Sequence, residues 1–289
     1  MMVSVWTFAS TIVFTFISFS AHALPIPLEL FRETRPRPIR AQIRYENGAL
    51  VKRWIRYFSV DNRARFERFM KRGSLYKTLI QDILTEHGVP AEMYYLAMVE
   101  SGFSRKARSH AQAVGVWQFA ASTARLYGLR VDKEVDERLD IIRSTRAAAR
   151  HLKELYAEFG SWNMAMAAYN CGVGCVRRAI RRGGTRDFWK LAQKRLLPLE
   201  TIHYIPKFQA ALQIGRHPER YGFKRKKVYK FPLVRKVRVK EPVSLKQLAQ
   251  KYRVPPSALI SLNLHLLKGR VPKGGYEVWL PAKNKSEKG

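Results

Sequence analysis

Cysteine is nearly absent from this sequence. Only two of its 289 residues are cysteine, Cys171 and Cys175. Two cysteines cannot form a disulfide framework or supply a zinc site. Their spacing puts them on one helix face or on either side of the turn at 172–174. Two interpretations stay open, a disulfide formed in an oxidising compartment or a pair of small buried side chains.

Acidic residues are also scarce relative to basic ones. The chain has 22 Asp and Glu against 54 Lys and Arg, which gives a formal net charge of +32 and a pI near 10.6. Such an excess indicates either a strongly solvated surface or an anionic partner. Nucleic acid, acidic polymers of the cell envelope and lipid head groups all qualify. No recognised nucleic-acid motif is present, which argues against nucleic acid.

The sequence lacks a long apolar run. Val5–Phe19 is the main candidate, and it is too short for a membrane span. Residues 1–23 instead predict a secretory signal, with Ala21-His22-Ala23 as the cleavage site. No Lys or Arg precedes the apolar core, so an uncleaved anchor is the alternative, and no cysteine for lipid attachment lies at the site. We expect export to the periplasm or cell envelope, with membrane attachment left open.

The rest of the chain divides by composition. Residues 24–88 read as a proline-rich arm followed by amphipathic helices that buttress the next region. Residues 89–216 are almost entirely helical in pattern, and 217–234 form a basic linker. Within the helical region, Ser144 is expected to cap a long helix, and Pro206 is expected to interrupt the last one. Residues 235–282 predict a small strand-helix-helix-strand domain. The predicted fold class is therefore mainly α, with a small C-terminal α+β domain.

A single carboxylate marks the centre of the helical region. The predicted helix from Pro90 ends at Glu100, because Ser-Gly follows and is typical of a turn. Glu100 thus lies at the negative end of the helix dipole on a segment rich in apolar and aromatic residues. Both features disfavour the ionised form and predict a raised pKa. A carboxyl group that stays protonated near neutrality suits a general acid.

Two later motifs combine aromatic and amide side chains. Gly115–Phe119 contains Trp117, Gln118 and Phe119, and 167–172 places Tyr169 and Asn170 before a glycine. Aromatics and amides beside one acid are more typical of a sugar-binding cleft than of a core.

The motifs ESGF, Ser109, AVGVWQF, VDERLD, AAYNCG and ETIHYIP occur in one order between Val89 and Ala211. In this set and order the chain resembles the lytic transglycosylases of peptidoglycan, and most of all their membrane-bound D type. The resemblance implies a lysozyme-like all-α catalytic domain. The later segments LKQLAQKYRV and ALISLN resemble a LysM-type glycan-binding module.

The resemblance implies cleavage of the β-1,4 bond between N-acetylmuramic acid and N-acetylglucosamine, with a 1,6-anhydro product and no cofactor. Glu100 would be the acid and then the base. Peptidoglycan strands would be the partner. The substrate-binding residues carried over from the family are Ser109, Gln118, Tyr169, Asn170 and Tyr204. The family commonly has a small residue where Cys171 stands, which favours small buried cysteines over a disulfide.

The sequence departs from the family pattern at Gln112, where glycine is common, and at Ala120 and Ala121, where Met-Pro is common. Two rival functions remain. If a carboxylate of the VDERLD motif (Asp136, Glu137 or Asp140) faced Glu100, a lysozyme-like hydrolase would be possible, although the motif favours a structural loop with Arg138 paired to an acid. The other rival is a non-catalytic binder of peptidoglycan or envelope polyanions. No metal-ligand cluster and no phosphate-binding glycine loop are visible.

Overall fold

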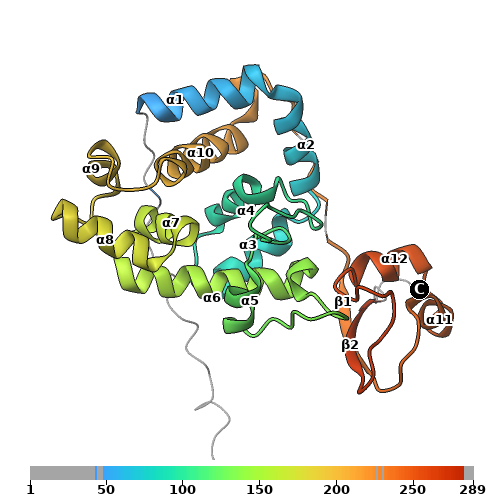
Figure 1. Ribbon diagram of the computed structural model, residues 1–289. Helices are drawn as coiled ribbons and strands as arrows, with labels where there is room; N and C mark the ends of the chain where they lie inside the picture. Colours follow the sequence, from blue (N-terminus) through green and yellow to red (C-terminus); the bar gives the residue numbers. More distant parts are fainter. Residues whose placement is uncertain (1–42, 44–47, 226, 230, 283–289) are drawn as a thin grey trace, which may run out of the picture. The chain divides into compact units, whose positions relative to one another are not determined.

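The computed structural model describes residues 43, 48–225, 227–229 and 231–282. The predicted signal at 1–23 and the arm that follows it lie outside this part of the chain. Within it, no helix is both long and apolar enough to cross a membrane. The secondary structure is mainly helical, as the sequence predicts (Figure 1).

The α-helices before the C-terminal region are α1 Ala49–Arg56, α2 Arg63–Gly73, α3 Lys77–Glu86, α4 Tyr94–Ser101, α5 Ala121–Leu126, α6 Ile141–Phe159, α7 Trp162–Cys171, α8 Val173–Gly183, α9 Phe188–Gln193 and α10 Leu199–Arg216. A π-helical turn, Tyr57–Asp61, continues α1, and 3₁₀ turns occur at Ala91–Met93, Glu137–Leu139 and Pro218–Tyr221. Helix α10 runs through Pro206 without the interruption that the sequence suggested.

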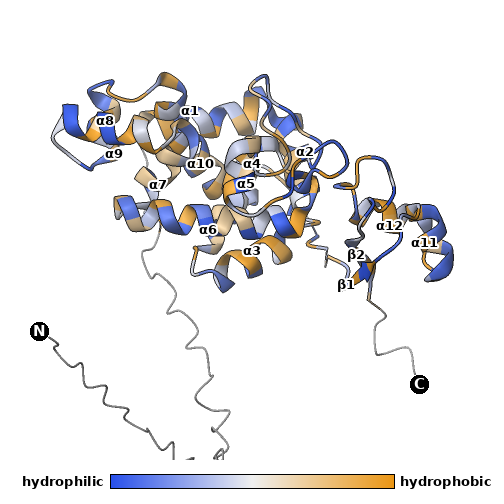
Figure 2. Cartoon of the chain, turned by 60° about the horizontal axis from the view of Figure 1, so that its bottom comes forward, coloured by the Kyte–Doolittle hydropathy of each residue, from blue (hydrophilic) through white to orange (hydrophobic). Residues whose placement is uncertain are grey.

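The longest helix, α6, shows how the core forms. Ala148, Leu152, Leu155 and Phe159 recur at spacings of three and four and are all buried, so one side of α6 faces the core. Hydrophobic and hydrophilic residues alternate along the helix in Figure 2. We expected Ser144 to cap α6, but that is wrong. Asp140 caps it one turn earlier, because its side chain accepts the backbone N–H groups of Ile142 and Arg143.

Packing of α6 against α3 and α7, and of α10 against α1, α4 and α7, makes one large apolar core. This core holds α4, the helix that ends at Glu100, with Leu96 and Ala97 fully buried. The N-terminal helices do more than buttress this region, since α1 and α2 also line the cavity described below.

Residues 234–281 form a C-terminal module of β1 Val234–Val239, α11 Leu245–Lys251, α12 Pro256–Leu262 and β2 Tyr276–Pro281. The strand-helix-helix-strand order matches the prediction. The two strands are antiparallel, with Val234 opposite Pro281 and Val239 opposite Tyr276. A capping box at Ser244 and Gln247 begins α11.

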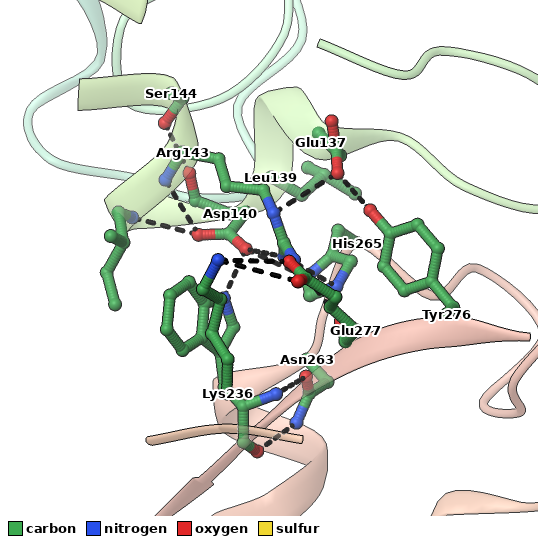
Figure 3. Close-up of polar contacts among 12 residues, drawn as sticks. Glu137, Leu139, Asp140, Arg143, Ser144, Lys236, Asn263, His265, Tyr276 and Glu277 are labelled. Carbon is green, nitrogen blue, oxygen red and sulfur yellow. Dashed lines mark hydrogen bonds and ion pairs between the residues drawn. The ribbon is translucent and has the colours of Figure 1, made fainter. Parts of the chain in front are cut away.

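A buried polar network joins this module to the segment that leads into α6. Asp140 accepts a hydrogen bond from Trp279 Nε1 at 2.6 Å and pairs with Arg143 at 2.7 Å. Arg143 also contacts Glu137 and Glu277, as Figure 3 shows, and Tyr276 donates to Glu137. Because these groups are mostly hidden from solvent, the module is held by directional contacts in addition to the chain connection.

Candidate active site

Glu100 lies in the last turn of α4, as the sequence predicts. The helix ends there because Gly102 adopts a left-handed conformation, with φ of 55°. A Cβ atom at Gly102 would collide with the Phe69 ring of α2. The Ser-Gly pair therefore ends the helix and also lets α2 pack close to the carboxyl group.

Tyr204 of α10 contacts the carboxyl group directly. Its hydroxyl donates a hydrogen bond to Glu100 Oε1. Burial raises the pKa of Tyr204 well above its usual range, so the phenol stays protonated and acts as a donor. Lys207, one turn along α10, lines the cavity beside Glu100. One helix thus brings a neutral donor and a cation to the same acid.

The segment 115–119 forms a second wall. Gly115 has a φ of 85°, and a Cβ atom there would collide with the Arg138 carbonyl oxygen. Trp117 is fully buried and donates from Nε1 to Thr145 Oγ1 at 2.9 Å. Ser101 Oγ donates to the Val116 carbonyl at 2.9 Å, which ties this wall to the end of α4.

Gln118 is the residue of this segment that lines the cavity. Its amide nitrogen donates to the Gly115 carbonyl at 2.8 Å. Its amide oxygen accepts no hydrogen bond from the described residues, so an acceptor is available to a ligand. Ser109 lines the same cavity, and its Oγ accepts the Ala113 N–H at 3.0 Å. Gln112 adopts a φ of 59°, a left-handed conformation that glycine adopts more easily than other residues.

Tyr169 and Asn170 contact the segments that carry the cavity-lining residues. The Tyr169 hydroxyl donates to the Trp117 carbonyl at 2.7 Å, and the Glu100 carboxyl is near enough to add to the burial that raises the pKa of Tyr169. Asn170 accepts from Thr201 Oγ1 at 2.7 Å and donates to Glu200 at 3.3 Å. Neither residue lines the cavity. Asn170 connects the end of α7 to the start of α10, which carries Tyr204.

The electrostatic state of Glu100 follows from these surroundings. Burial raises the pKa of Glu100 to about 7. The hydrogen bond from Tyr204 and the charge of Lys207 oppose the rise, whereas the negative charge of Glu200 adds to it. A carboxyl group with a pKa near 7 can both donate and accept a proton at neutral pH.

The cavity in front of Glu100 has a volume of about 600 Å³. Aromatic residues of α1 and the turn after it, Trp54, Tyr57 and Phe58, line one part. Basic residues line another. Glu100 is the one carboxylate among the described residues that line it. No group of three or more His, Cys, Asp or Glu side chains in the described part of the chain could hold a metal ion.

Comparisons with known proteins identify two domains in the chain. Residues 78–192 match the family described as Transglycosylase SLT domain, and residues 234–287 match Lytic transglycosylase MltD, LysM-like domain. The chain therefore carries an SLT domain followed by an MltD-type LysM-like domain.

Among curated proteins, the membrane-bound lytic murein transglycosylase D of Escherichia coli K12 is 34% identical over 197 residues. That match covers 66% of this chain and 43% of the relative, so the chain spans less than half of its length. A putative tributyltin chloride resistance protein of Alteromonas is 36% identical over 110 residues, covering 38% of this chain and 53% of that protein. The chain is thus a homologue of lytic murein transglycosylases.

Among solved structures, an inactive mutant of lytic transglycosylase Slt from Pseudomonas aeruginosa is similar at 22% identity with a TM-score of 0.42. It covers 48% of this chain and 24% of that one.

The rival carboxylates of the SLT domain lie elsewhere. Asp136 pairs with Arg138 at 2.8 Å, as predicted for a structural loop. Glu137 and Asp140 belong to the network shared with the C-terminal module (Figure 3). None of the three lines the cavity that holds Glu100, so the structure does not bring a second carboxylate of this motif to the site.

The structure decides between the two interpretations of the cysteines and adds one feature that was not predicted. Cys171 and Cys175 form a disulfide across the junction of α7 and α8, so our preference for unpaired cysteines was wrong. The sequence interpretation also missed the basic lining of the cavity from α2. Arg65, Phe69 and Arg72 are spaced by four and three, which puts them on one helix face and could have revealed it.

Proposed function

We propose that this protein is a lytic transglycosylase that cleaves peptidoglycan between N-acetylmuramic acid and N-acetylglucosamine, with Glu100 as its acid and base. One observation carries the proposal. A single carboxyl group with a pKa of about 7 lies in a cavity that no second carboxylate of the described residues lines. Hydrolysis by the usual two-carboxylate route needs two such groups on either side of the bond.

In the proposed reaction, protonated Glu100 donates its proton to the glycosidic oxygen. The bond between that oxygen and muramoyl C1 breaks, and the carboxylate then takes the proton of the muramoyl 6-hydroxyl. The 6-oxygen bonds to C1 and closes the 1,6-anhydro ring, so no water is consumed. The same carboxyl group is thereby restored to its protonated form.

The neighbours of Glu100 suit both steps. Tyr204 donates to one carboxyl oxygen in either state, and this bond is stronger once Glu100 is charged. Lys207 also favours the charged state. We propose that Gln118 and Ser109 hold the sugar or its acetamido group from the cavity wall, while Tyr169 and Asn170 position the wall and α10.

The C-terminal module supports binding to the same polymer. Its similarity to an MltD LysM-like domain leads us to propose that it binds glycan strands and that residues 217–234 act as a basic linker into it. We also propose an envelope location, since the Escherichia coli relative is named as membrane-bound.

The test is product analysis. Purified protein is incubated with purified sacculi, and the muropeptides are identified by mass spectrometry. Products with 1,6-anhydromuramic acid ends are expected. Reducing ends would identify a hydrolase, and intact strands that stay bound to the protein would identify a non-catalytic binder. Either result would overturn the proposal.

A further inference from the structure

The cavity in front of Glu100 has a basic wall. Arg65, Arg68 and Arg72 of α2 line it together with Arg108 and Lys207. We refer to these five residues as the basic wall. They come from three segments far apart in the sequence, so the cluster exists only in the folded chain.

The three arginines of α2 form an ordered row. Their spacing of three and four residues puts them on one face of the helix. Phe69 lies between Arg65 and Arg72, and each guanidinium carbon is 5.5 Å from the centre of its ring. Cation–π contacts of this kind reduce the freedom of the guanidinium groups without neutralising their charge.

No residue of the basic wall forms an ion pair within the described residues, although the charge of Lys207 acts on Glu100. Other basic residues nearby do form ion pairs. On α2 itself, Arg63 lies 3.6 Å from Glu67 and donates to the Gly222 carbonyl. Further along, Arg216 pairs with Glu92. The helix therefore has a paired side and an unpaired side, and the unpaired side faces the cavity.

The only carboxyl group beside these five charges, in the described part of the lining, is Glu100. Since the pKa of Glu100 is near 7, it neutralises at most a fraction of the charge. The cavity is therefore a strongly positive concavity, which concentrates anions at the place where Glu100 acts.

The remaining lining indicates which anion fits. Trp54, Tyr57 and Phe58 offer aromatic faces close to the basic wall, and Lys207 lies 4.7 Å from the centre of the Trp54 ring. Aromatic faces suit the apolar faces of sugar rings. Guanidinium groups suit carboxylates, which they bind through paired hydrogen bonds. A sugar that carries carboxylates satisfies both halves of the lining.

We propose that the basic wall binds carboxylates carried by the glycan strand and makes the cleft selective for strands that bear them. This inference rests on the proposed function and names its substrate class. Two sources of carboxylate exist in peptidoglycan, the stem peptides and the lactyl group of muramic acid where the peptide has been removed.

The test compares wild type with the triple variant Arg65→Gln, Arg68→Gln, Arg72→Gln. The matched control is Arg178→Gln, Arg181→Gln, Arg182→Gln on α8, three exposed arginines that change the net charge equally and do not line the cavity. Substrates are strands with stem peptides, the same strands with amidated carboxylates, and strands freed of peptide. Circular dichroism and thermal unfolding check the fold, and Arg68→Gln alone is a milder second variant.

For strands with free carboxylates, the triple variant should raise KM about tenfold or more, since each exposed pair contributes only a modest amount and three are lost. Amidation should weaken the wild type by a similar factor and the triple variant little. The source of the carboxylate is assigned by comparing strands with and without stem peptides: it is the one on the strands whose KM rises more in the triple variant. Arg68→Gln should show a smaller rise in the same direction.

Three outcomes would overturn the inference. The triple variant could match wild type, the α8 control could weaken binding equally, or amidation could have no effect while a polyphosphate competes. Binding of the same strands to Glu100→Gln, with and without the three α2 substitutions, is measured in parallel because it needs no catalysis. If wild type gives no anhydro ends, the proposed function fails. If anhydro ends form but the arginines do not matter, only the inference about the wall fails.

Discussion

Glu100 lines a cavity and Asp140 is buried, and the pKa values of these two carboxylates move in opposite directions. Burial alone raises both. At Glu100 the hydrogen bond from Tyr204 and the charge of Lys207 offset burial only partly, so the pKa rises to about 7. At Asp140 the effects that lower the pKa outweigh burial. The charges of His265 and Arg143, the Arg143 N–H and the Trp279 indole N–H together lower the pKa.

The surroundings of Glu100 suit proton transfer, whereas those of Asp140 suit a structural role. His265 adds its charge only when protonated, and burial lowers its own pKa to about 4. Near neutrality Arg143 is therefore the cation that stabilises Asp140. A carboxylate with so many donors cannot release or take a proton at neutral pH, whereas Glu100 can. The difference lies in how many donors surround each group, not in how deeply it is buried.

The largest expected effect is on turnover. Glu100→Gln should reduce the rate of strand cleavage about a thousandfold or more, because one group supplies both proton transfers. Asp140→Asn is the same exchange in the other carboxylate, and it should leave the rate of strand cleavage by the folded protein nearly unchanged. Release of anhydro-muropeptides under single-turnover conditions measures both. A Glu100→Gln protein with more than a tenth of the wild-type rate would show that the acid lies elsewhere.

Stability should respond in the opposite order. Asp140→Asn leaves Arg143 without its closest partner in a buried network, which costs about 3–5 kcal/mol for such pairs. Urea unfolding should therefore show a lower free energy of unfolding, or an early transition for the C-terminal module. Glu241→Gln, an exposed carboxylate of the module, is the control. Equal stability of the two variants would mean that the network contributes nothing to docking.

Glu100→Gln should stabilise the folded protein, and by an amount that depends on pH. The folded-state pKa of about 7 lies above the ordinary value of 4.5, so the folded protein binds more protons than the unfolded chain between these values. Wild-type stability therefore falls as pH rises through this window. The variant lacks the penalty, and its advantage should be smallest near pH 4 and reach about 3 kcal/mol above pH 7. Unfolding of both proteins from pH 4 to pH 8 measures the difference. A constant difference would contradict a raised pKa.

The smallest expected effect is on the pKa of Glu100. Tyr204→Phe removes the hydrogen bond that lowers the pKa of Glu100, so that pKa should rise further. The decline of kcat/KM on the alkaline side should then move to higher pH, with a loss of about tenfold at the optimum because the carboxylate formed after proton donation is less stable. Tyr127→Phe, which loses a hydrogen bond to Glu154 at a distance from Glu100, is the control. An unshifted pH profile would mean that Tyr204 has only a packing role.

Much of the fold could be predicted from local patterns. Apolar spacing identified the helices, and turn residues identified their ends, because both depend on neighbours within a few positions. The strand-helix-helix-strand order of the C-terminal module was likewise confirmed. The sequence interpretation placed the cap of α6 at Ser144 instead of Asp140, because both are good capping residues. Only the folded structure shows at which of the two the helix begins. The functional roles of Ser109, Gln118, Tyr169, Asn170 and Tyr204 stay predictions.

The sequence by itself determined that Glu100 ends a buried helix, because apolar residues precede it and Ser-Gly follows. Only the tertiary structure decided what surrounds that carboxyl group. Tyr204, which contacts it, lies 104 residues later in the chain. The arginines of α2, which line its cavity, come before Glu100 in the sequence. Likewise Asp140 acquires its donor Trp279 across 139 residues. The pKa of a carboxylate depends on groups within a few ångströms in space, and spacing along the chain does not reveal which groups those are.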